Sequence, residues 1–142
     1  MFDPRVPRRA EPGGEGVVST ARDYARFLQM LLNGGQLQGR RVLSQDSVKE
    51  MTRDQLIGIA RGQAYTPSPL YTFGLGVAVR TAGRDVLPAG EPGDFAWSCA
   101  GGTYFWGDPQ NQLMVVLMVQ APRAGRSLRP VLRQGVYDAL QP

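Results

Sequence analysis

The chain has 142 residues, of which 42% are hydrophobic, and carries a net charge of +4; it contains no histidine and a single cysteine. This length fits one domain with its own core, and no apolar run approaches the ~18 residues of a membrane-spanning helix. The composition excludes a Ser-His-Asp triad, a Cys-His dyad, a histidine metal site, a zinc-binding thiolate cluster and an internal disulfide. We expect neither a metal ion nor another cofactor.

The basic residues do not predict a nucleic-acid-binding protein. Lysine occurs once, as Lys49, and the arginines are spread along the whole chain. A nucleic-acid interface gathers its basic side chains on one face or along one helix. We therefore interpret the arginines as solvated surface residues and expect no nucleic-acid partner.

Residues 1–16 are rich in proline, glycine and arginine and predict an extended leader, followed by a single domain at residues 17–142. The leader lacks the apolar segment of a secretory signal peptide. A single cysteine suits a reducing compartment. We therefore expect a cytoplasmic protein without a membrane partner.

The first part of the domain predicts two helices. Thr20 can cap the first one, with Asp23 three residues later as a capping-box-like pair. The helix ends at the glycines of Asn33-Gly34-Gly35, which can take the left-handed cap conformation. Ser44 can cap the second helix. The apolar face of the first helix consists of Tyr24, Phe27, Leu28, Leu31 and Leu32.

Strands follow a loop at residues 57–69. Apolar side chains at every second position predict one strand over residues 71–80. Residues 94–99 and 103–106 read as two strands around the tight turn Ala100-Gly101-Gly102. Residues 113–119 are apolar on both faces, which is typical of a strand covered on both sides. The apolar face of the strand at 71–80 consists of Phe73, Leu75, Val77 and Val79.

A third helix is expected near the C-terminus, packed across the sheet. Ser127 can cap it, and Pro130 then falls in the first turn, where its missing N–H costs little. Its expected apolar face consists of Leu128, Val131, Leu132, Val136 and Leu140.

The segment from Trp97 to Trp106, Trp-Ser-Cys-Ala-Gly-Gly-Thr-Tyr-Phe-Trp, resembles the third active-site motif of the serine β-lactamase, penicillin-binding protein and esterase superfamily. The match is to the class C-like β-lactamase and esterase branch, with departures at Ser98 and Cys99. The first predicted helix, Ser-Thr-Ala-Arg-Asp-Tyr-Ala-Arg-Phe, is similar to a family helix as well. The resemblance covers only the C-terminal part of a full family member.

The resemblance implies an α+β fold: a partial β-lactamase/transpeptidase-like domain with an antiparallel sheet of about four strands, two N-terminal helices and a C-terminal helix. It also implies that the backbone N–H of Ala100 is an oxyanion-hole donor and that Trp97, Ser98 and Cys99 form a substrate wall. β-Lactamases carry lysine at the position of Trp97, so tryptophan favours an esterase. The alternatives are structural: Trp97 and Trp106 as core aromatics, and Cys99 as a small buried strand residue.

The nucleophile of this family is a Ser-x-x-Lys pair, in which the amine of a helical lysine accepts the serine proton. The chain lacks this pair, because Asp46 stands three residues before its only lysine, Lys49. No Tyr-x-Asn motif is present either. We therefore expect no activity from this chain alone, and a small ester or amide substrate only if an N-terminal half completes the site. The alternative is a non-catalytic binding or oligomerisation module.

Assembly is also expected, because the strand at residues 113–119 would lie at the edge of the sheet. It carries no charge and no proline that would discourage pairing with another chain. The sequence therefore predicts a homo-oligomer through this edge.

Overall fold

The computed structural model describes residues 17–60, 69–83, 85–121 and 125–140. A helix α1 (Ala21–Leu32), a short hairpin of β1 (Gln36–Leu37) and β2 (Arg40–Arg41), and a helix α2 (Gln45–Met51) come first. The main sheet contains β3 (Tyr71–Phe73), β4 (Ala78–Arg80), β5 (Phe95–Ser98), β6 (Tyr104–Asp108) and β7 (Leu113–Leu117). Helix α3 (Gly125–Ala139) ends the described chain.

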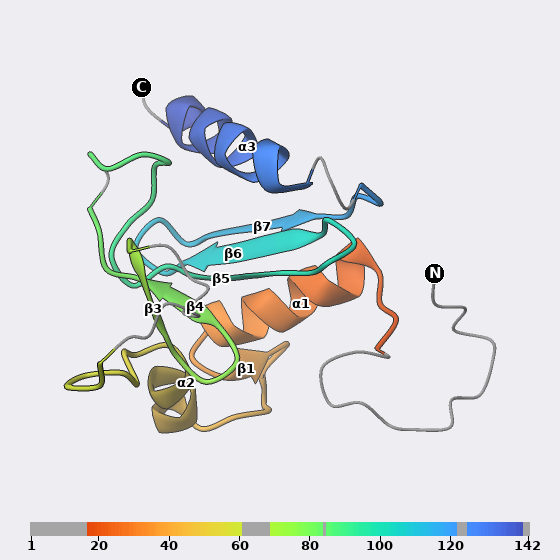
Figure 1. The fold of residues 1–142 in the computed structure, drawn as a ribbon. Helices are drawn as coiled ribbons and strands as arrows, with labels where there is room; N and C mark the ends of the chain where they lie inside the picture. The colour runs from red at the N-terminus through yellow and green to blue at the C-terminus, as the bar shows by residue number, and fades with distance from the viewer. Residues whose placement is uncertain (1–16, 61–68, 84, 122–124, 141–142) are drawn as a thin grey trace, which may run out of the picture.

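The five strands of the main sheet are antiparallel and follow one another in chain order, from β3 to β7. Helix α1 lies on one face of this sheet and α3 on the other, as Figure 1 shows. The predicted α+β class is therefore confirmed. The leader at residues 1–16 lies outside the described residues, so the domain boundary stays a prediction.

The two N-terminal helices begin where the sequence predicts. The Thr20 hydroxyl accepts a hydrogen bond from the N–H of Asp23 at 3.1 Å, and the Ser44 hydroxyl accepts one from Ser47 at 3.0 Å. The N–H of Gly35 donates to the carbonyl of Met30 at 2.8 Å and closes the C-terminal end of α1. Local capping chemistry was sufficient to place these ends.

The single strand predicted over residues 71–80 is wrong, because the segment folds into the hairpin of β3 and β4. The N–H of Gly74 donates to the carbonyl of Val77 at 2.8 Å, and Gly76 has a φ of +81°. Leu75 lies in the turn and is 53% exposed. The alternating pattern continues through the reversal, so periodicity alone did not reveal it, and the sheet has five strands rather than about four.

Helix α3 differs from its prediction at both its start and its buried face. It begins at Gly125, whose N–H bonds to the carbonyl of Ala121 at 2.8 Å, so Ser127 is not its cap and Pro130 lies inside it. Val131 is 70% exposed, and the helix instead buries Arg133. The expected apolar face is therefore only partly correct: Leu132 and Val136 pack on the sheet, while Leu128 and Leu140 are exposed.

Strand β7 is apolar on both faces, as predicted. Met114 and Val116 pack against the cluster beneath α1, while Leu113 and Val115 pack against the cluster beneath α3. Both helices thus bury apolar side chains of the same strand, which fixes its position between the two layers.

Candidate active site

The turn between β5 and β6 has the tight geometry predicted for its glycines. The N–H of Cys99 donates to the carbonyl of Thr103 at 3.0 Å, and the N–H of Gly102 donates to the carbonyl of Cys99 at 3.1 Å. Gly102 has a φ of +107°, and a Cβ there would lie 2.8 Å from the carbonyl oxygen of Ala121. Glycine is therefore required at this position both by backbone conformation and by space.

Ala100 occupies the exposed corner of this turn. Within the described residues, no hydrogen bond uses its backbone N–H. An exposed N–H on a turn fixed by neighbouring hydrogen bonds can donate to a ligand oxygen without first breaking a bond within the protein.

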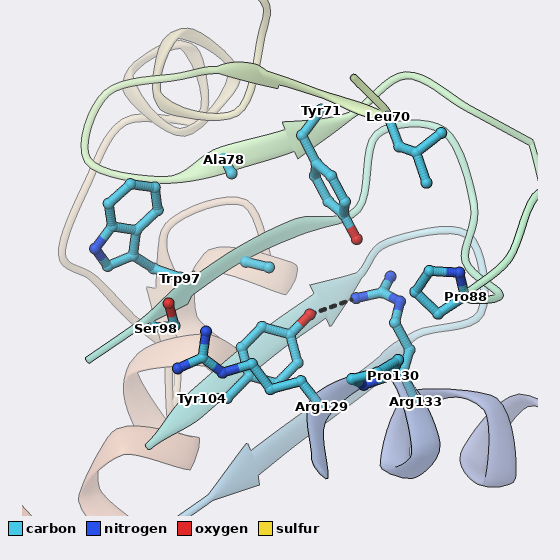
Figure 2. A pocket seen from close by; sticks show the side chains of 11 residues that line it. Leu70, Tyr71, Ala78, Pro88, Trp97, Ser98, Tyr104, Arg129, Pro130 and Arg133 are labelled. Carbon is cyan, nitrogen blue, oxygen red and sulfur yellow. Dashed lines mark hydrogen bonds between the residues drawn. The ribbon is translucent and has the colours of Figure 1, made fainter. Parts of the chain in front are cut away.

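Two of the predicted wall residues line a pocket of about 500 Å³ beside this turn, on the α3 side of the sheet (Figure 2). Trp97 is 37% exposed at one end, where its ring meets Phe73 edge to face with centroids 5.2 Å apart. Ser98 lies next to it along β5. The pocket is lined by Leu70, Tyr71, Ala78, Pro88, Ala96, Trp97, Ser98, Tyr104, Arg129, Pro130 and Arg133.

The structural interpretations of Cys99 and Trp106 have different outcomes. Cys99 is exposed and follows the last residue of β5, so its interpretation as a small buried strand residue is wrong. The strand ends at Ser98 because the turn takes over the backbone hydrogen bonds of Cys99. Trp106 is fully buried against Tyr137, so the core interpretation is confirmed for this residue.

One residue of the pocket lining, Arg133, belongs to a buried ion pair that sequence reasoning missed. The Arg133 guanidinium, 1% exposed, is bound to the Asp94 carboxylate through Nη2. It also donates to the Tyr104 hydroxyl at 2.9 Å and to the Ala89 carbonyl at 2.6 Å. Figure 2 shows the guanidinium and the Tyr104 hydroxyl meeting at the pocket wall. Because Arg133 is held by Asp94 and Ala89, its hydrogen bond to the Tyr104 hydroxyl fixes the position of that hydroxyl.

A second arginine, Arg80, is also 1% exposed and donates to the carbonyls of Ala82, Gly83 and Val86. The interpretation of the arginines as solvated surface residues is therefore wrong for Arg80 and Arg133. Both are buried because carbonyl oxygens or a carboxylate satisfy their N–H groups.

Burial dominates the electrostatics of Asp94. It raises the pKa of the carboxyl from its ordinary value near 3.8 to about 7, against the opposing positive charges of Arg133 and Arg80. Among the described residues, Asp94 Oδ1 has no hydrogen-bond partner. Burial also raises the pKa of the Tyr104 hydroxyl, so Tyr104 is a neutral phenol at physiological pH.

The sequence contains one regularity that belongs to this network, although by itself it does not predict burial. Arg129, Arg133 and Tyr137 recur at intervals of four and therefore lie along one stripe of α3. This polar stripe, beside the apolar one, faces the sheet.

Comparison with known proteins agrees with the fold. The chain matches a solved structure, EstCE1, described as a hydrolase with promiscuous acyltransferase activity, with a TM-score of 0.68 and 25% sequence identity over 92% of this chain. Two curated relatives from Mycobacterium tuberculosis strains, Protein Rv1367c and Uncharacterized protein MT1414, are each 36% identical over 113 residues, or 75% of this chain. Residues 2–136 match the Beta-lactamase family, and the chain belongs to this family.

The chain spans less than a third of these proteins: 28% of each curated relative and 32% of EstCE1. None of the helices described in the structure is long and apolar enough to cross a membrane.

Proposed function

We propose that this chain forms the oxyanion and substrate wall of an esterase-type serine hydrolase that acts through an acyl-enzyme. The observation that carries the proposal is the backbone N–H of Ala100: the residue is exposed, and the N–H lacks a hydrogen-bond partner among the described residues. It lies two positions after Ser98, which lines the pocket. Family membership supports hydrolase chemistry, and EstCE1 is itself a hydrolase with acyltransferase activity.

The chemistry assigns each group a role. During acyl transfer, negative charge develops on the carbonyl oxygen of the substrate, and the Ala100 N–H stabilises that charge. Trp97 and the apolar lining hold an apolar part of the ester, because tryptophan offers surface area and no positive charge. The proposed nucleophile is a Ser-x-x-Lys pair on a segment other than these 142 residues, which contain no such pair.

A chimera tests this role directly. The third of EstCE1 that this chain matches is replaced by this chain, and hydrolysis of p-nitrophenyl butyrate is measured. We expect activity in the chimera, a loss of roughly 10²–10³-fold in kcat for Ala100→Pro, which removes the N–H, and little change for Ala100→Gly, which keeps it. The isolated chain should not hydrolyse the ester.

Two results would contradict the proposal. The Ala100→Pro chimera could retain the kcat of its parent while its circular dichroism is unchanged. The isolated chain could hydrolyse the ester in a way that a serine-directed acylating inhibitor abolishes, which would mean that a nucleophile lies within these residues.

We further propose that the chain associates with itself through β7. Within the described residues, β7 pairs only with β6, so its outer row of N–H and C=O groups lies at the sheet edge. The edge position of β7 is the observation in favour of an oligomerisation module, and such a module is compatible with the hydrolase role.

A further inference from the structure

One peptide group of the glycine turn contains both the carbonyl of Cys99 and the N–H of Ala100. The carbonyl of Cys99 and the N–H of Ala100 belong to the same planar unit, so they point in opposite directions. The carbonyl oxygen accepts the N–H of Gly102 at 3.1 Å and lies 3.4 Å from Nη2 of Arg129, which donates to it. The N–H on the other side belongs to Ala100, an exposed residue.

The aromatic ring of Tyr104 helps to hold Arg129 at this carbonyl. Its guanidinium lies over the ring of Tyr104, 5.6 Å from the centroid, and that ring is in turn fixed by Arg133. Nε of Arg129 is buried and has no hydrogen-bond partner among the described residues. Figure 2 shows the side chain reaching from α3 to the space between Ser98 and Tyr104.

The helix that carries Arg129 is in direct contact with the turn. A Cβ on Gly125, the first residue of α3, would lie 2.6 Å from Cα of Gly102. The N–H of Ala121, just before the helix, donates to the carbonyl of Gly101 at 2.9 Å. The distance between the start of α3 and the turn is therefore set by backbone contacts.

We propose that Arg129 is a positioning residue for the oxyanion donor: it fixes and polarises the Cys99–Ala100 peptide so that the Ala100 N–H faces the reacting carbonyl. The inference rests on the proposed function of Ala100. Gly102 already orients the carbonyl, so the separate contribution of Arg129 is its charge. A cation at the oxygen end of a peptide dipole withdraws electron density and makes the N–H at the other end a stronger donor.

The length of the contact supports this division of roles. At 3.4 Å the bond is longer than the usual 2.7–3.2 Å range for N–H···O, so its directional part is weak. Coulomb attraction falls off slowly with distance and is stronger next to a half-buried site than in water. Removing the positive charge of Arg129 should therefore affect the Ala100 N–H more than changing the shape of the side chain.

The first test uses the 142-residue chain and needs no catalysis. The ¹⁵N chemical shift of a backbone amide responds to polarisation of the preceding carbonyl. In Arg129→Met, the ¹⁵N signal of Ala100 should move upfield by more than the signals of other turn residues, and Arg129→Lys should restore part of the shift. Arg126→Met is the matched control, because it removes the same charge from an exposed site on the same helix.

The second test uses the EstCE1 chimera. Arg129→Met should lower kcat on the order of tenfold with KM unchanged, a smaller loss than that from Ala100→Pro, and Arg129→Lys should recover part of it. The inference is overturned if Arg129→Met shifts Ala100 no more than Arg126→Met does, or if it changes KM and leaves kcat intact. If Ala100→Pro has no effect on kcat, the proposed function fails while the chemical-shift result still reports on Arg129.

Discussion

The two faces of the main sheet are built by different chemistry. Beneath α1 the buried side chains are hydrocarbon, centred on Leu28, Phe95 and Phe105. Beneath α3 the aromatic rings of Trp106 and Tyr137 surround the ion pair between Arg133 and Asp94. The first layer gains stability from apolar area, whereas the second depends on the ion pair and the hydrogen bonds of Arg133.

The difference follows the position of the pocket, which opens on the α3 side. Apolar side chains fill space well, but they make no directional bonds and so cannot fix the position of a polar group. The Arg133 network holds the Tyr104 hydroxyl at the wall through directional hydrogen bonds. The layer next to the pocket is therefore the more specific and the more vulnerable of the two.

The largest effect is expected from breaking the polar layer. Arg133→Met leaves the Asp94 carboxyl buried without its cation, which should cost about 3–5 kcal/mol of unfolding free energy at neutral pH. Urea unfolding measures it. The double variant Asp94→Leu with Arg133→Met should recover much of the loss, and a double variant as unstable as the single one would contradict this account.

The hydrocarbon layer should lose somewhat less. Leu28 is fully buried, and Leu28→Ala removes apolar contacts and leaves a cavity, which should cost about 3 kcal/mol. Since no charge is involved, the cost should be the same at pH 4.5 and pH 7. A cost that changes strongly with pH would mean that the two layers are coupled through the sheet.

A pH-dependent effect, smaller per pH unit than either loss above, should distinguish the layers. The pKa of Asp94 is about 7 in the folded chain and near 3.8 when unfolded, so the folded state binds more protons between these values. The contribution of this group is therefore fully present below pH 4 and is lost as the pH rises towards 7, at no more than about 1.4 kcal/mol per pH unit. Unfolding curves of Asp94→Asn should lack this component, and an identical pH profile would contradict the raised pKa.

The smallest effect concerns the edge strand, where both layers end. Val116 is partly buried against α1, so a charge there would also damage the core. Met118, just past β7 and 45% exposed, is the cleaner position. Met118→Lys should weaken self-association roughly tenfold by light scattering without lowering the melting temperature. A parent chain that is monomeric at micromolar concentration would disprove the assembly.

Prediction from sequence succeeded where the determinants are local. The caps at Thr20 and Ser44 and the glycine turn each depend on a few adjacent residues, and each was found. The reversal between β3 and β4 was missed because Gly74 packs against a carbonyl that is distant in the sequence. A Cβ at Gly74 would lie 2.1 Å from the oxygen of Met51. That contact is tertiary and leaves no trace in the alternation.

The candidate site contains groups that the sequence did not indicate. The resemblance pointed to Ala100 and Trp97, but not to the groups that support them. Asp94 and Arg133 are 39 positions apart, and charged residues are normally exposed, so nothing in either neighbourhood indicated a buried pair. The regular interval from Arg129 to Arg133 and Tyr137 becomes informative only when the sheet is known to lie against that stripe.

The close approach of Gly102 and Gly125 has a consequence for how this chain can change. A Cβ on Gly125 would lie 2.6 Å from Cα of Gly102, and a Cβ on Gly102 would lie 2.8 Å from the carbonyl oxygen of Ala121. Neither position can accept a side chain while the turn and the start of α3 keep this close contact. A library that randomises both codons should return glycine at both positions, and a change in the length of the β7–α3 connection should be tolerated only where it preserves this contact.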